Sequence, residues 1–95
     1  MKQHITKEQL DELRPKFQGI LAAELDLEIR AEEDFMELPT IGQMIEFLGD
    51  DLNEIRNNKF EYLIIVDDFK ICDGEDSLCD ALWEAVKYKL NEKLN

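Results

Sequence analysis

Side chains that could do chemistry are few and widely spaced in this chain. The sequence holds two cysteines, Cys72 and Cys79, and a single histidine, His4, in an N-terminal segment that we expect to fray. These three side chains cannot supply the four ligands of a structural zinc site, and no pattern pairs His4 with a nucleophile. Oxygen ligands at alternate positions, which a calcium loop requires, are missing before Gly74. We therefore predict no metal, no cofactor and no catalytic residue, with both thiols in or beside the core.

Two pairs of adjacent carboxylates, Asp50-Asp51 and Asp67-Asp68, are the remaining candidates for acid–base work. Adjacent residues on a helix point in different directions, and the second pair lies in a predicted turn. Because a raised carboxylate pKa needs burial, we interpret both pairs as solvated surface charge.

The string Gly74-Glu75-Asp76-Ser77-Leu78 places a serine where a helix is expected to begin, a position that favours negatively charged groups. The string resembles the modification site of acyl and peptidyl carrier proteins, where the serine takes a phosphopantetheine arm. The resemblance implies an all-helical carrier modified at Ser77. A second piece, residues 27–41, is similar to the stretch that follows the modified helix in carriers, but here it precedes the serine. We favour the interpretation that Ser77 caps the last helix with Asp80 in a capping box, and keep the carrier-like domain as the alternative.

Acidic charge is the feature that most constrains the function of the chain. The net charge is -12, with 23 Asp and Glu against 11 Lys and Arg. This charge argues against direct binding to nucleic acid or to an anionic membrane, and predicts a protein partner with a basic surface. Solubility alone is the competing explanation. The candidate partner-binding carboxylates are Glu32, Glu33, Asp34, Glu37, Asp50, Asp51, Asp67 and Asp68.

Periodicity in the first half predicts a helix, a short strand and a loop. Thr6 can cap the first helix. Pro15 predicts either a kink or two abutting helices, and the apolar stripe that runs on through it favours the kink. Strict alternation predicts a short extended segment over residues 26–30. Residues 31–39 read as an acidic loop, with three apolar side chains tucked back on the core: Phe35, Met36 and Leu38.

The second half predicts a helix, a hairpin and a last helix. The second helix starts after Thr40 and continues past Gly49 to Asn57-Asn58. The hairpin pairs residues 60–66 with 69–72 around an Asp67-Asp68 turn. A second turn occupies residues 73–76, and the last helix runs over about 76–94. Because apolar residues alternate onto both faces of the 60–66 strand, a homodimer that buries the second face is compatible with the sequence.

These elements predict a single α+β domain over residues 1–95, in the order α-(β)-α-β-β-α. Three main helices pack on a small antiparallel hairpin, with residues 26–30 as an optional third strand. The longest apolar run, Tyr62 to Val66, is far shorter than the ~20 residues of a membrane helix. With no signal peptide and no disulfide framework, the sequence predicts a cytoplasmic protein.

Two further resemblances bear on function. The string Leu78-Cys79-Asp80-Ala81-Leu82-Trp83-Glu84-Ala85-Val86 resembles short proteins of bacterial and prophage genomes. Small acidic domains of this size also resemble phage- and plasmid-encoded inhibitors, which occupy the nucleic-acid channel of a basic protein with carboxylates in place of phosphates. The expectation is a non-enzymatic protein-binding module.

Overall fold

A computed structural model of the chain describes residues 3–33, 35–58, 61–75 and 77–93. The elements run in this order: α1 (Lys7–Leu10), α2 (Pro15–Leu25), β1 (Ile29–Arg30), a 3-10 helix η1 (Ala31–Glu33), β2 (Phe35–Met36), α3 (Ile41–Leu48), a 3-10 helix η2 (Gly49–Asp51), β3 (Leu52–Asn58), β4 (Glu61–Val66), β5 (Phe69–Glu75) and α4 (Leu78–Lys93). Antiparallel pairing gives one three-stranded sheet, β3-β4-β5, and one two-stranded sheet, β1-β2. The predicted α+β class is confirmed.

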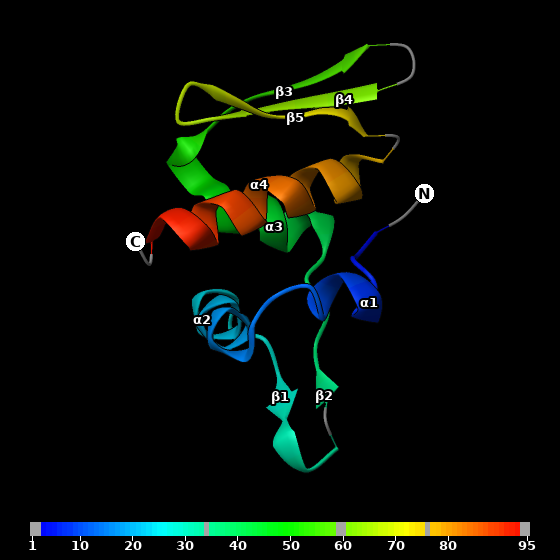
Figure 1. Cartoon of the computed structure of the whole chain (residues 1–95), viewed down its shortest axis with the longest axis vertical. Helices are drawn as coiled ribbons and strands as arrows, with labels where there is room; N and C mark the ends of the chain where they lie inside the picture. The colour runs from blue at the N-terminus through cyan, green and yellow to red at the C-terminus, as the bar shows by residue number, and fades with distance from the viewer. Residues whose placement is uncertain (1–2, 34, 59–60, 76, 94–95) are drawn as a thin grey trace.

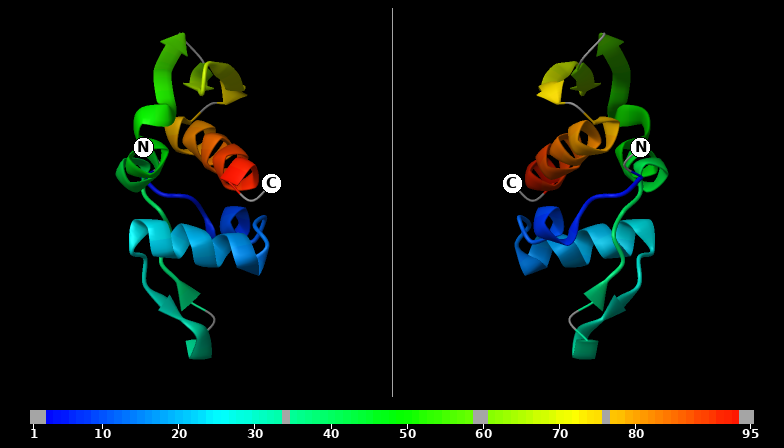
Figure 2. Two further views of the ribbon diagram at one scale, coloured as in Figure 1. Left: turned by 90° about the vertical axis from the view of Figure 1, so that its left-hand side faces the viewer. Right: turned by 90° about the vertical axis from the view of Figure 1, so that its right-hand side faces the viewer.

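The elements are layered along the longest of the three dimensions, 43 × 30 × 19 Å. Figure 1 shows the three-stranded sheet at one end, α4 and α3 beneath it, α1 and α2 next, and the β1–β2 hairpin at the other end. The two side views in Figure 2 agree that the small hairpin extends away from the helices. One sheet face therefore packs on helices, and the small hairpin projects from the body.

The N-terminal stripe forms two helices, where the sequence favoured one kinked helix. Thr6 caps α1 as predicted, since its hydroxyl oxygen accepts from the backbone N–H of Gln9 at 3.1 Å. Pro15 occupies the first turn of α2, a position that needs no backbone N–H donor. The chain therefore breaks before Pro15, and the Gln18 amide donates to backbone carbonyls at the end of α1, including that of Leu10 at 3.1 Å.

The segment around His4 is ordered, which corrects the expectation that it frays. His4 forms an isolated antiparallel bridge with Thr40. The backbone N–H of Ile5 donates to the Pro39 carbonyl at 3.3 Å, and the Ile5 side chain is fully buried. The first residues of the described chain are thus pinned beside the start of α3.

The second helix ends earlier than predicted. Thr40 caps it as expected, with a capping box to Gln43. Gly49 then stops α3 with a φ of 53°, a conformation that strongly favours glycine, and nothing lies within 4 Å of where its Cβ would be. Leu52 and Ile55, which the helical stripe included, lie on β3 instead. The residues predicted to end the helix, 57 and 58, are also part of this strand.

The predicted hairpin is confirmed and extended. Asp67 and Asp68 both have positive φ, 52° and 65°, as the two-residue hairpin turn that matches strand twist requires. The Val66 and Phe69 backbones pair directly beside this turn. Residues 73–75, predicted as a turn, instead continue β5, while Asp76 lies outside the described residues. The third strand of the sheet is β3, and residues 29–30 of the predicted 26–30 strand pair only with β2.

The buried apolar side chains form one cluster with members from β4 and from all four α-helices, and α4 contributes the largest of them. Trp83 is 1% exposed, and its indole N–H donates to a Glu12 carboxylate oxygen at 3.1 Å. Trp83 is therefore a core residue whose one polar side-chain atom has a partner. Cys79 is fully buried, as predicted, whereas the Cys72 side chain lies outside what the structure describes.

Candidate protein interface

The β1–β2 hairpin is built on a sharp turn at the end of α2. Asp26 adopts a left-handed conformation (φ 55°) that ends the helix, and Leu27 then turns into the core, 8% exposed. The backbone N–H of Glu37 donates to the Glu28 carbonyl at 2.8 Å and closes the base of the hairpin. The buried side chain of Met36 anchors the returning strand. The base of the hairpin is therefore held firmly, although each strand has only two residues.

Two large apolar side chains on this hairpin face solvent. Ile29 is 51% exposed and Phe35 is 37% exposed. The guanidinium of Arg30 lies 4.1 Å from the centre of the Phe35 ring, a cation–π contact. Phe35 was predicted to tuck back on the core, and this prediction was wrong. Met36 and Leu38 do pack against the core as expected.

Carboxylates surround the two exposed apolar residues. Glu28, Glu32 and Glu33 are exposed, and Glu37 is half-buried. Arg30 pairs with Glu33 at 2.9 Å and with Glu28 at 3.6 Å. Residues 28–37 hold five acidic side chains and one basic one, although Asp34 lies outside the described residues. We call residues 28–37 the acidic hairpin.

The other four predicted carboxylates form a second cluster at the opposite end of the molecule. Asp51, in η2, and Asp67, in the β4–β5 turn, both bind Lys89 of α4, with oxygen–nitrogen distances of 2.7 and 3.0 Å. The Lys89 side chain is only 13% exposed, and its hydrogen bond to Asp51, followed by that to Asp67, raises the Lys89 pKa despite burial. Asp51 and Asp67 therefore hold α4 against the sheet.

Asp50 and Asp68 complete this second cluster, and both are exposed. The backbone N–H of Asp68 donates to the side-chain oxygen of Asn53 at 2.7 Å, which fixes the turn. The structure thus separates the predicted acidic surface into the acidic hairpin and this second cluster, and it gives half of the second cluster a role in holding the fold.

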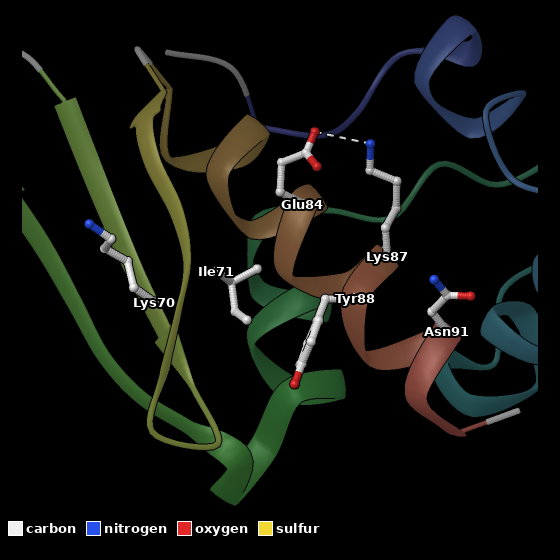
Figure 3. A pocket seen from close by; sticks show the side chains of 6 residues that line it. All are labelled: Lys70, Ile71, Glu84, Lys87, Tyr88 and Asn91. Atoms are coloured by element: carbon white, nitrogen blue, oxygen red, sulfur yellow. Dashed lines mark hydrogen bonds and ion pairs between the residues drawn. The ribbon is translucent and has the colours of Figure 1, made fainter. Parts of the chain in front are cut away.

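An open groove between β5 and α4, of about 750 Å³, is shown in Figure 3. It is lined by Lys70, Ile71, Glu84, Lys87, Tyr88 and Asn91. Lys87 lies 3.0 Å from Glu84 and 3.4 Å from Glu12. Burial lowers the pKa of Lys87, but its hydrogen bonds and charge interactions with the two carboxylates outweigh burial and leave this pKa raised. Lys87 is therefore protonated at neutral pH, and its ammonium group links α4 to Glu12, which follows α1.

Ser77 lies directly before α4 and acts as a local hydrogen-bond acceptor. Its hydroxyl oxygen accepts from the backbone N–H of Asp80 at 3.4 Å, and its carbonyl accepts from the N–H of Ala81 at 3.0 Å. The side chain is half-buried. The bond from the Asp80 N–H to the Ser77 hydroxyl confirms one half of the predicted capping box. A strand, β5, precedes the serine, unlike the all-helical carriers that the local string resembles.

Comparison of the chain with protein-family models, curated proteins and solved structures gives no match. Across the described ranges, no three His, Cys, Asp or Glu side chains are grouped so that they could hold a metal ion. No helix within the described part of the chain is long and apolar enough to cross a bilayer.

Sequence reasoning found the carboxylates of the acidic hairpin but missed its apolar residues. The alternation that predicted an extended segment over residues 26–30 did not reveal that Ile29 is exposed, because exposure cannot be read from an apolar residue's type. The sequence did offer one signal, because the alternating segment is short. Four apolar positions are few for a strand that packs one whole face on the core.

Proposed function

We propose that this protein is a non-enzymatic binding module, which docks the acidic hairpin onto a basic surface of another protein. The observation that carries this proposal is the juxtaposition of Ile29 and Phe35, 51% and 37% exposed, with surrounding carboxylates on a projecting element. Central apolar anchors within a charged rim are the usual anatomy of a protein interface.

The apolar, acidic and basic side chains of the acidic hairpin would each contribute to binding in a different way. Burying the remaining surface of Ile29 and Phe35 contributes affinity, because apolar area leaves water. Exposed carboxylates such as Glu32 and Glu33 accelerate encounter with a cationic surface and make it sensitive to salt. Arg30 holds the Phe35 ring and so reduces the ordering that binding would require.

The partner that we favour is a basic nucleic-acid-binding protein, whose phosphate-binding surface the carboxylates would occupy. The charge of -12 supports a cationic partner, because it repels nucleic acids and anionic membranes themselves. The cytoplasm, where thiols such as Cys79 stay reduced, is the compartment that we propose for this interaction.

A photo-cross-linking amino acid at position 35 tests the proposal in cell extracts, where the salt concentration can be set. We expect it to capture a protein with a basic surface, and expect capture to fall when Ile29→Glu is added or when the salt concentration is raised. The matched control is Ile45→Glu, since Ile45 is as exposed as Phe35 but lies on α3. Capture that is unaffected by Ile29→Glu, or capture of an acidic protein only, would refute the docking site.

A further inference from the structure

The strand β3 forms an outer edge of the three-stranded sheet. The strand order is β3-β4-β5, so β3 and β5 each pair on one side only within the described sheet. Figures 1 and 2 show the helices on one face of the sheet, and no described segment runs along the outer side of β3. Unpaired strand edges are templates for another strand unless the fold blunts them.

The two edge strands, β3 and β5, differ in how regular they are and so in how readily each could pair with another strand. The pairing of β5 with β4 has two register shifts, which distort that edge. The pairing of β3 with β4 is regular over residues 54–58, after a single shift near the start of the strand. No proline interrupts β3. The β3 edge is therefore the one suited to pairing.

The backbone hydrogen bond from Asp67 N to Asp51 O, 2.9 Å long, shows which groups of β3 face outward. It flanks the first residue pair of the β3–β4 ladder, which must therefore be a non-hydrogen-bonded pair. Alternation along β4 makes the pair two residues further on, Ile64 with Ile55, non-hydrogen-bonded as well. The N–H and C=O of Ile55 consequently point to the free edge.

The side chains at this edge are self-complementary. Ile55 is 38% exposed and is flanked by Glu54 and Arg56, whose side chains are 40% and 63% exposed and lie 2.8 Å apart. In an antiparallel pair of identical strands centred on Ile55, the residue before Ile55 in one copy lies opposite the residue after Ile55 in the other copy. Glu54 of each copy would then face Arg56 of the other.

We propose that β3 is a homodimerisation edge, at which two copies of this chain pair antiparallel about Ile55. The two Ile55 residues exchange a pair of backbone hydrogen bonds, and the two three-stranded sheets become one continuous sheet. The interface is isologous, as a two-fold axis through Ile55 requires. It lies at the opposite end of the molecule from the acidic hairpin and is independent of the docking proposed above.

Sedimentation analysis with charge reversals tests this pairing, over protein concentrations up to about 1 mM. We expect a concentration-dependent dimer. Glu54→Arg and Arg56→Glu should each weaken it about tenfold, since two opposite-charge pairs become like-charge pairs. The double variant Glu54→Arg/Arg56→Glu is the matched control, because it restores both pairs and should restore the dimer. Unchanged circular dichroism spectra establish that each variant folds.

Amide hydrogen exchange of Ile55 separates this dimer from any other. Its N–H should exchange rapidly in dilute protein and slowly at concentrations where the dimer forms. A chain that stays monomeric throughout overturns the proposal. So does a dimer that resists both single reversals and leaves Ile55 exchanging rapidly, which would place the contact elsewhere, such as on the outer face of the sheet.

Discussion

Replacing Lys89 with methionine removes the cation that joins α4 to η2 and the β4–β5 turn. Lys89 donates to Asp51 and Asp67 at 2.7 and 3.0 Å and is 13% exposed, while the two carboxylates are 47% and 27% exposed. Charge-assisted hydrogen bonds contribute roughly 1.5–3 kcal/mol each when buried, and solvent screening of the carboxylates reduces this. We expect Lys89→Met to lower the free energy of unfolding by about 2 kcal/mol, and Tm by roughly 10 °C.

Urea denaturation followed by circular dichroism measures this difference, and an exposed ion pair provides the control. Lys7 lies 3.0 Å from Asp11, but these side chains are 52% and 56% exposed. Lys7→Met should therefore change stability by no more than about 0.5 kcal/mol. Equal effects for Lys7→Met and Lys89→Met would refute the reasoning, since burial is what distinguishes the two pairs.

The pH dependence of this contact has a definite sign. The pKa of Lys89 is raised in the folded protein by Asp51 and Asp67. Its stabilisation is fully present below the unfolded pKa of about 10.4 and is lost only as pH rises above it toward the folded value. The stability difference between the natural protein and Lys89→Met should be constant near neutral pH and should narrow above about pH 10.4. A difference that narrows near neutral pH would contradict this assignment.

Four further results are expected. Gly49→Ala should cost about 1–3 kcal/mol in urea denaturation, because its φ of 53° strains any side chain. Gly19→Ala, inside α2 with nothing within 4 Å of its Cβ, should instead stabilise by about 0.5–1 kcal/mol, and equal effects would contradict the assignment of Gly49 as a helix stop. Ser77→Ala should cost about 1 kcal/mol through the lost cap, and the intact mass of the natural chain should not change on treatment with coenzyme A and a phosphopantetheinyl transferase. A gain of the arm at Ser77 would favour the carrier alternative.

Local signals were enough to predict several elements of the fold. The capping residues Thr6 and Thr40 and the turn at Asp67-Asp68 act through their immediate neighbours, so the sequence alone reveals them. The apolar stripe of α4 is equally local. The α+β class follows from these elements.

The end of α3 could not be predicted from the sequence, because it depends on distant pairing. Leu52 and Ile55 happen to have the spacing of the apolar stripe of α3, so they looked helical in the sequence. In the structure they pair with Val66 and Ile64 of β4. A glycine inside a helical pattern costs only about 1 kcal/mol, so Gly49 alone did not reveal the break. Strand pairing decided the outcome.

The candidate interface was predictable only in its charge. Carboxylates such as Glu32 and Glu33 are exposed wherever the chain places them, whereas the exposure of Ile29 and Phe35 depends on how far the acidic hairpin projects. The same limit applies to Lys89, whose two carboxylate partners come from elements far away in sequence.

The dissociation constant for the partner captured at position 35, measured by titration calorimetry, tests the central claim most directly. Fully burying an isoleucine or phenylalanine contributes about 1.5–3 kcal/mol, and Ile29 and Phe35 retain about half and about a third of that surface. Ile29→Ala/Phe35→Ala should therefore weaken binding about 30-fold, and Ile45→Ala should leave it unchanged. Binding that survives the double variant, or that Ile45→Ala weakens equally, would contradict docking through the acidic hairpin.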